Sequence, residues 1–167
     1  MLHPDVIVKK SKIAGRGLFA KRKISRGTIL WRLKDFRAYD KKDLKKFSKK
    51  YADMIKKFAY EDWDGKLIYC IDKAKFWNHS CNPNSAPLNE ETDIAVMNIQ
   101  KGEELTYDYA VLLKDFEAPV RCKCGEKNCR HIVKRLKRNS KIVKALYARA
   151  KRAARSLKKV KQPLLKN

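Results

Sequence analysis

The sequence lacks the features that would place the protein in a membrane or outside the cell. No apolar run reaches the length of about 18 residues that a membrane-spanning helix requires. The first residues, MLHPDVIVKKS, contain no apolar stretch of signal-peptide length. We therefore expect an intracellular protein with no membrane partner, in the cytoplasm or nucleoid of a prokaryote or on the chromosomes of a eukaryotic nucleus. In such a reducing compartment, five cysteines favour metal or redox chemistry over disulfides.

Acidic residues are absent from the C-terminal part of the sequence. The formal net charge is +24, and no Asp or Glu follows Glu126. Residues 130–167 carry 15 Lys or Arg. A run of one sign and this length is typical of a segment that binds a polyanion, with nucleic acid ahead of acidic proteins or anionic lipid. A solubilising face is the alternative.

The length and the hydrophobic pattern predict one domain that is mostly β. Short strands are expected at 5–9, 17–20, 28–33, 66–71, 94–99 and 103–109. Between the third and fourth strands, apolar residues recur every three or four positions over residues 40–60, which predicts an inserted helix with Asp40 as its N-cap. The apolar positions of this helix are Leu44, Phe47, Tyr51, Met54, Ile55 and Phe58.

A second helical segment is predicted from Ile132 onwards. Asn139 and Ser140 mark a break and a candidate cap, and Pro163 would end the helix. Its apolar stripe comprises Ile142, Leu146, Ala150, Ala153 and Leu157. The rest of this helix is strongly cationic.

A cysteine cluster, CKCGEKNC, occupies residues 122–129. Its three thiolates form a soft donor set that lacks one ligand of the tetrahedral four of a structural zinc site. Candidates for the fourth ligand are Cys81, Cys70, His131 and His79. Cys81 lies in a polar turn before Pro83, whereas Cys70 lies in an apolar strand, where a small core residue is more usual. The spacing predicts zinc, and free thiols in a loop are the alternative.

Three other stretches each allow more than one interpretation. GRGLFA from Gly15 fits a dinucleotide-binding pattern, but the charged stretch KRKISRG follows it in place of an amphipathic helix. A glycine turn that lets the backbone approach another ligand remains open. FWNHSCNPN at 76–84 suits a nucleophile and its base, a metal site or a tight turn. In GEELTYDY at 102–109, Tyr107 and Tyr109 share one face of a strand, which usually indicates core packing.

Taken in order, these segments resemble the SET-domain family of protein-lysine methyltransferases. The matching stretches are AGRGLF at 14–19, FWNHSCNPN at 76–84, GEELTYDY at 102–109 and the cysteine cluster at 122–129, which resembles a post-SET segment. The resemblance implies a SET-domain β-fold over residues 1–118 with an insert at 40–60 and a zinc-binding segment at 119–131. The family does not specify residues 132–167, which the residues themselves predict to be a basic helical tail. The NHSC turn would lie in a knot-like crossing of the chain.

The resemblance also implies the ligands. S-adenosylmethionine would be held on one side by Asn78 and His79, with Tyr109 beside it. The opposite wall of its pocket would be formed by Ala14, Gly15, Arg16 and Gly17. Cys81 would complete a structural Zn²⁺ site with Cys122, Cys124 and Cys129.

The implied reaction transfers a methyl group from S-adenosylmethionine to a lysine. Tyr109 would be the catalytic tyrosine that orients the amine, and Tyr107 would tune the number of methyl groups, with mono- or dimethylation favoured. The lysine must arrive neutral although its pKa in solution is about 10.4. A neighbouring sulfonium and a partly dry aromatic channel both favour the neutral amine. The expected substrate is a basic, histone-like protein associated with chromatin, DNA or ribosomes.

Some features depart from the family pattern or lie outside it. Lys75 stands where the family has Arg, and residues 1–13, before the AGRGLF stretch, contain no cysteine-rich segment. The insert would line the peptide groove. The tail has three competing roles: nucleic-acid binding, which we favour, docking on its own domain, and serving as a methylation substrate. Two rival functions are a nucleic-acid-binding protein that uses the fold as scaffold and a catalytically silent recruitment module.

Overall fold

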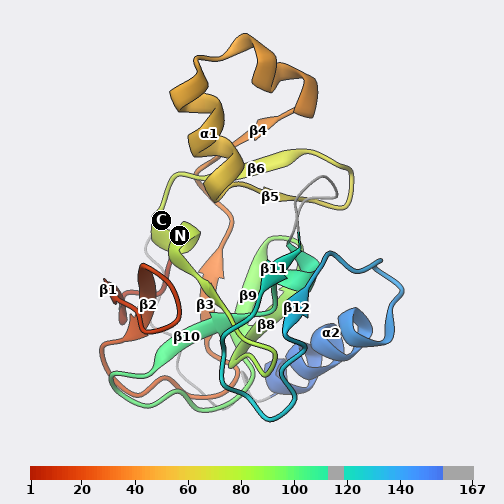
Figure 1. The fold of residues 1–167 in the computed structure, drawn as a ribbon. Coiled ribbons are helices and arrows are strands. Elements are labelled where there is room, and N and C mark those ends of the chain that lie inside the picture. The colour runs from red at the N-terminus through yellow and green to blue at the C-terminus, as the bar shows by residue number, and fades with distance from the viewer. Residues whose placement is uncertain (113–118, 156–167) are drawn as a thin grey trace.

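The structure is a computed structural model that describes residues 1–112 and 119–155. Within these ranges it contains many short strands, two α-helices and three short 3₁₀ helices (Figure 1). The expectation of a mostly β fold with an inserted helix and a C-terminal helix is confirmed. Among the described helices, none has the length and hydrophobicity needed to span a membrane.

The first sheet brings together segments that lie far apart in the sequence. Its strands are β1 (Val6–Lys10), β2 (Arg16–Ala20), β10 (Glu104–Tyr107) and β7 (Asn78–His79), in that order. β1, β2 and β10 pair antiparallel, whereas β10 and β7 pair parallel. This last register sets Thr106 beside Asn78 and Tyr107 beside His79. The GRG, NHS and TYD stretches therefore meet on adjacent strands.

The other strands form two three-stranded sheets and one short pair. One sheet has the order β3 (Ile29–Arg32), β9 (Thr92–Ala95), β8 (Ser85–Asn89). The next has the order β4 (Phe36–Tyr39), β6 (Leu67–Cys70), β5 (Tyr60–Glu61), and β11 (Val120–Arg121) pairs with β12 (Ile132–Val133). The fully buried Leu18, Leu30, Ile94 and Leu105 place the main core between the first two sheets. The strand expected at 94–99 lies earlier, at Thr92–Ala95.

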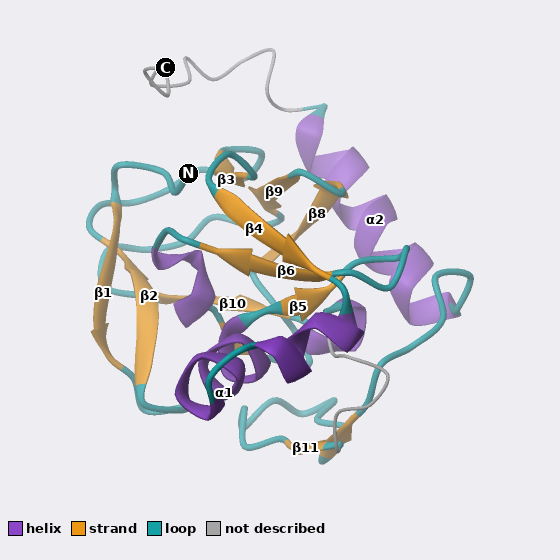
Figure 2. Cartoon of the chain, turned by 90° about the horizontal axis from the view of Figure 1, so that it is seen from above, coloured by secondary structure: helices purple, strands orange, loops and turns teal. Residues whose placement is uncertain are grey.

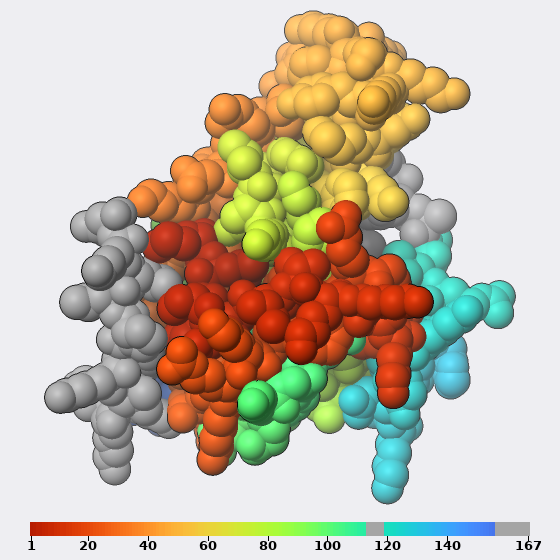
Figure 3. Space-filling view, turned by 90° about the vertical axis from the view of Figure 1, so that its left-hand side faces the viewer, coloured from red at the N-terminus to blue at the C-terminus, as the bar shows by residue number. Residues whose placement is uncertain are grey.

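The insert forms a lobe that stands above the body of the molecule (Figure 3). Its α-helix, α1, spans only Lys49–Phe58, and a 3₁₀ helix covers Lys41–Lys46. The expected N-cap was wrong: Asp40 makes no side-chain cap, whereas the Ser48 hydroxyl accepts a hydrogen bond from the Tyr51 amide at the start of α1. Ile55 is the buried centre of a small satellite core.

The basic tail begins as a strand and a loop, and its helix comes later than expected. The second helix, α2, spans Lys141–Ala154, and the Ser140 side chain accepts from the amide of Val143. The buried residues of α2 are Val143, Leu146, Ala150 and Ala153. Ile142 was expected in this stripe but is exposed, because Val143 holds the inward position. Leu157 and Pro163 lie outside the described residues. Figure 2 shows α2 lying along β8 and β9, so the docking interpretation of the tail holds for this helix.

Candidate active site and metal centre

Asn78 ties the glycine turn to the first sheet. Its side-chain amide donates hydrogen bonds to the carbonyl of Ala14 at 3.2 Å, the carbonyl of Arg16 at 3.1 Å and Glu104 Oε1 at 2.7 Å. Gly17 lies in this contact, because a Cβ built there would come within 2.0 Å of Glu104 Oε1. The structure thus brings the 14–17 turn and Asn78 together, as expected from the sequence. A side chain at Gly17 would have to displace the Glu104 carboxylate, which accepts the hydrogen bond from Asn78.

His79 holds the tyrosine segment in place. Its Nδ1 accepts a hydrogen bond from the Tyr109 amide at 3.1 Å, and its Nε2 lies 3.3 Å from Cys81 Sγ. Burial lowers the pKa of His79, and the nearby carboxylate of Asp108 opposes that shift. Both ring nitrogens of His79 therefore contact groups of the protein itself, the Tyr109 amide and the Cys81 sulfur.

Asp108 is buried between the tyrosines and the cysteine cluster. Its carboxylate accepts from the Ala110 amide at 2.9 Å and so caps the 3₁₀ helix Tyr109–Val111. Arg130 donates to the same carboxylate at 2.6 Å and also donates through Nε to Cys81 Sγ at 3.4 Å. Asp108 thus fixes backbone geometry next to Tyr109.

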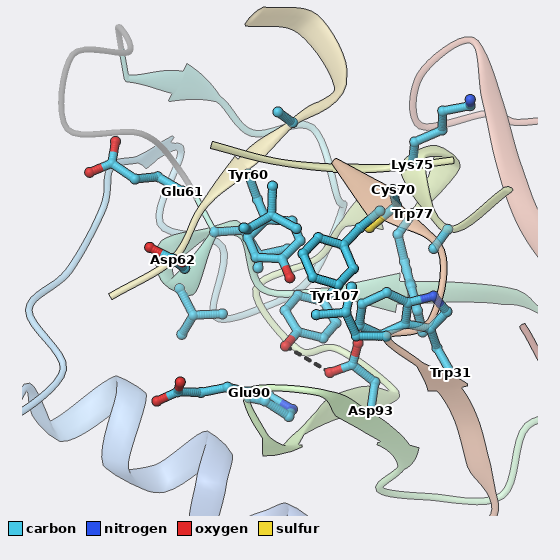
Figure 4. A pocket seen from close by; sticks show the side chains of 18 of the residues that line it. Trp31, Tyr60, Glu61, Asp62, Cys70, Lys75, Trp77, Glu90, Asp93 and Tyr107 are labelled. Carbon is cyan, nitrogen blue, oxygen red and sulfur yellow. Dashed lines mark hydrogen bonds between the residues drawn. The ribbon is translucent and has the colours of Figure 1, made fainter. Parts of the chain in front are cut away.

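A cavity of about 350 Å³ opens beside these tyrosines (Figure 4). Its aromatic lining consists of Trp31, Phe36, Phe58, Tyr60, Trp63, Trp77, Tyr107, Tyr109 and Tyr147. The Tyr109 hydroxyl donates to the carbonyl of Trp77 at 2.6 Å, and the Tyr107 hydroxyl donates to Asp93 Oδ1 at 3.0 Å. Burial raises the pKa of Asp93 to about 7, against the opposing effect of the hydrogen bond from Tyr107. Burial also raises the pKa of Tyr107.

Several cavity residues were not foreseen from the sequence. Asp93, Tyr60 and Trp77 line the cavity, yet none was singled out. The only sequence signal for Asp93 was an acid directly before the apolar run IAV, at a position that the structure places inside β9. Both expected site tyrosines, Tyr107 and Tyr109, reach this cavity.

Four thiols converge where β7 leads into the NHSC turn. The sulfur atoms of Cys81, Cys122, Cys124 and Cys129 lie within 4.8 Å of one another. Tetrahedral zinc with Zn–S bonds of about 2.3 Å separates its sulfurs by about 3.8 Å. The Cys81–Cys122 distance is 3.8 Å, so the set fits a zinc ion. Of the candidates for the fourth ligand, the structure brings Cys81 to the cluster. Cys70 is buried in β6, where burial raises its pKa to about 12.

The SET-domain family model matches residues 15–110, which is more than half of the chain. The chain belongs to the SET-domain family. Among curated relatives, human histone-lysine N-methyltransferase 2B is 33% identical over 154 residues, covering 75% of this SET-domain chain and 5% of that protein. The H3 lysine-36 specific histone-lysine N-methyltransferase of Debaryomyces hansenii is 33% identical over 144 residues, covering 76% and 19% respectively. This chain thus spans less than a fifth of the length of these relatives.

Solved structures show the same fold. KRYPTONITE in complex with mCHG DNA and SAH matches with a TM-score of 0.56 at 23% identity, over 78% of this chain and 29% of that one. The methyltransferase domain of human histone-lysine N-methyltransferase SETMAR matches with a TM-score of 0.56 at 18% identity, over 80% and 59%. The SET-domain β-fold and a post-SET-like cysteine cluster, both expected from the sequence, are confirmed.

Proposed function

We propose that this protein is an S-adenosylmethionine-dependent protein-lysine N-methyltransferase. The observation that carries the proposal is the junction at Asn78: its side chain donates to the carbonyls of Ala14 and Arg16 in the glycine turn, and its strand β7 pairs with β10, which leads into Tyr109. The aromatic cavity then opens from Tyr109. Curated relatives named histone-lysine N-methyltransferases support the same reaction.

The cofactor residues fit a ligand that needs close backbone approach. Ala14, Gly15, Arg16 and Gly17 would form one wall, with the backbone turned by Gly15 at a positive φ of 46°. Asn78 and His79 would form the other wall, largely through their backbone, because both side chains are engaged in holding the turn and Tyr109. S-adenosylmethionine would supply a methyl group on a sulfonium.

The side chain of the substrate lysine would bind in the aromatic cavity. Its rings would limit the access of water to the bound side chain, and a less hydrated surrounding favours a neutral amine over an ammonium. Tyr109 donates its hydroxyl proton to Trp77, so towards a ligand its oxygen can only accept a hydrogen bond. It would therefore hold an N–H of the amine and turn the nitrogen lone pair towards the methyl group. Positioning for in-line displacement, rather than covalent catalysis, would supply most of the rate.

Tyr107 would limit the number of methyl groups. Its hydroxyl occupies space in the cavity and offers an oxygen to the amine. We expect mono- or dimethylated product, and we expect Tyr107→Phe to raise the share of more highly methylated lysine. Mass spectrometry of the product lysine measures that share, and an unchanged distribution in the variant would contradict this role.

The substrate would be a basic protein bound to nucleic acid, on chromatin in a eukaryotic cell. Labelled S-adenosylmethionine, added with the protein to a fractionated extract of the source cell, tests both the reaction and the substrate. We expect label in a basic, DNA- or RNA-associated protein. Tyr109→Phe should lose at least about 100-fold in rate, since it removes the group that positions the amine.

The matched control is Tyr51→Phe, which removes a hydroxyl that lies on α1 outside the cavity. It should keep the wild-type rate. Cofactor binding by both variants, measured by calorimetry, separates loss of chemistry from loss of fold. If Tyr109→Phe transferred methyl groups as fast as the control, the assignment of Tyr109 would be wrong. Retained cofactor binding without any transfer by the wild type would favour the silent recruitment module.

A second role is proposed for the basic tail, on the basis of how α2 docks. Its apolar face is buried on the body, which leaves cations on the outer surface: Lys141, Lys144, Lys151, Arg152 and Arg155. We propose that this face binds nucleic-acid phosphates. Affinity for duplex DNA or RNA should then fall steeply with salt concentration, because neutralising phosphates releases counterions. Replacing Lys144 and Lys151 by Gln should make that slope shallower, whereas a salt-independent affinity would argue for a purely structural tail.

A further inference from the structure

One carboxyl group inside the aromatic cavity has no role in the proposed function. Asp93 lies on β9, with most of its surface buried, and Figure 4 shows its carboxyl group directed at the Tyr107 hydroxyl. Within the described part of the chain, no ion pair to this carboxyl group occurs. A buried acid without a cation is costly to ionise, so its hydrogen bond to Tyr107 is its main stabilising contact.

The two cavity tyrosines share a pattern of hydrogen bonding. The Tyr109 hydroxyl donates to the carbonyl of Trp77, and the Tyr107 hydroxyl donates to Asp93. A hydroxyl that has given its proton to the protein can only accept from a ligand. A neutral primary amine has two N–H groups, which match these two acceptors. Each added methyl group removes one N–H and leaves one tyrosine oxygen without its partner.

We propose that Asp93 is a positioning residue that determines how many methyl groups the protein adds, because it keeps the Tyr107 hydroxyl turned away from the target amine. The proposal rests on the proposed methyltransferase function. Asp93 acts through Tyr107 and does not itself touch the amine. Without Asp93, the Tyr107 hydroxyl can rotate. Its oxygen then no longer needs an N–H from the amine, so a methylated amine is accepted at a smaller free-energy cost.

The arrangement depends on the ionisation of Asp93. A carboxylate can only accept the Tyr107 proton. A protonated Asp93 can instead donate to Tyr107, which turns the phenol proton into the cavity and towards the nitrogen lone pair that must attack the methyl group. Burial raises the pKa of Asp93 to about 7, so this change falls near neutral pH. As pH falls through that value, transfer should slow.

The tyrosines and the cysteine near Asp93 stay uncharged over this range. Tyr60 on β5, Cys70 on β6, Tyr107 on β10 and Tyr147 on α2 all have a pKa raised by burial. The carboxylates of Asp62 and Glu90 also line the cavity. A step in the rate near pH 7 that disappears in Asp93→Asn would be assigned to Asp93.

Two substitutions separate the two parts of the proposal. Asp93→Leu removes the acceptor, and the rate of the second methyl transfer relative to the first should rise about fivefold, the factor expected for one hydrogen bond. Tyr107→Phe should shift the products in the same direction, and the double variant no further. Asp93→Asn keeps an acceptor oxygen but cannot ionise, so the products should stay like those of the wild type while the step near pH 7 disappears. Asp5→Asn is the matched control, because Asp5 pairs with Arg22 outside the cavity.

A measurement without turnover checks the same contact. Carbon-13 NMR of the Asp93 carboxyl should give a pKa of about 7, and Tyr107→Phe should raise it, because the lost hydrogen bond favours the carboxylate. An Asp93 pKa near that of a solvated carboxyl, or Asp93→Leu products like those of the wild type, would overturn the inference alone. A wild type that binds S-adenosylmethionine but transfers no methyl group would overturn the proposed function and this inference together.

Discussion

At the scale of single residues, the polar groups of the site mainly hold other groups in place. The Asn78 side-chain amide donates to the glycine turn, and the His79 ring accepts from the Tyr109 backbone. The Asp108 carboxylate caps the 3₁₀ helix. These are short-range contacts between segments 30 or more residues apart in most cases, such as Tyr109 with His79. The hydroxyl groups of Tyr107 and Tyr109 lie at the cavity, where the proposed function gives them their roles.

Gly17 is the residue where this packing is tightest. We expect Gly17→Ala to destabilise the protein by about 1–3 kcal/mol, because its Cβ would overlap the Glu104 carboxylate and displace the Asn78 contact. Urea unfolding measures this change. Cofactor affinity should fall as well, since the same contact shapes the turn.

Gly102→Ala serves as the comparison for Gly17. Gly102 has a positive φ of 81° and no atom within 4 Å of a built Cβ, so only backbone strain of about 1–2 kcal/mol should result. Cofactor affinity should not change in this variant. Equal loss of cofactor affinity in both variants would contradict the account of Gly17.

The sequence predicted the four cysteines that fit a zinc site, but it did not single out Asp93 in the cavity. The C-x-C-x₄-C spacing is local and indicates three candidate ligands directly, whereas the choice of Cys81 as the fourth came from the family resemblance. The hydrogen bond from Tyr107 to Asp93 joins two strands that are not paired with each other, and no local pattern marks it. The expected roles of the tyrosines and of the cofactor residues remain predictions.

At the scale of elements, the limits of the predicted strands were mostly closer to the structure than the limits of the predicted helices. The inserted helix was expected over 40–60, but its α-helical part begins at Lys49, where Ser48 offers a capping hydroxyl. The tail was expected to be helical from Ile132, yet β12 and a loop come first. In both cases the apolar spacing began before the first residue of the α-helix, because a 3₁₀ helix or a short strand that precedes it also carries apolar residues that pack inwards.

The docking of α2 gives a test at this scale. Leu146 is 5% exposed and packs against the body, whereas Ile142 on the same helix is 39% exposed. We expect Leu146→Ala to lower the free energy of unfolding by about 2–4 kcal/mol. Ile142→Ala should change it by less than about 0.5 kcal/mol. Thermal or urea unfolding compares the two, and similar losses would show that α2 does not dock as described.

At the scale of the whole molecule, the C-terminal part closes the fold around the site. Arg130 joins the cysteine cluster to Asp108, next to Tyr109. Arg135 donates to the backbone carbonyls of Glu61 and Asp62 at the cavity, and its guanidinium lies over Trp63. The C-terminal part of the chain thus contacts both the tyrosine segment, through Arg130, and the cavity wall at Glu61 and Asp62, through Arg135.

Zinc would stabilise this closure. We expect one zinc ion per chain by metal analysis, and we expect chelation to lower the unfolding temperature and the activity together. Cys122→Ser should reproduce the effect, whereas Cys70→Ser should retain the zinc, since Cys70 lies in β6 away from the cluster. A protein that keeps its zinc after Cys122→Ser would contradict the assigned ligand set.

The measurement that tests the central claim most directly is the intact mass of a lysine-rich basic protein after incubation with this chain and S-adenosylmethionine. The account predicts a gain of one or two methyl groups per modified lysine, located on lysine side chains by fragmentation and absent with Tyr109→Phe. Cofactor binding without any gain in mass, on histone-like proteins both free and bound to DNA, would contradict it.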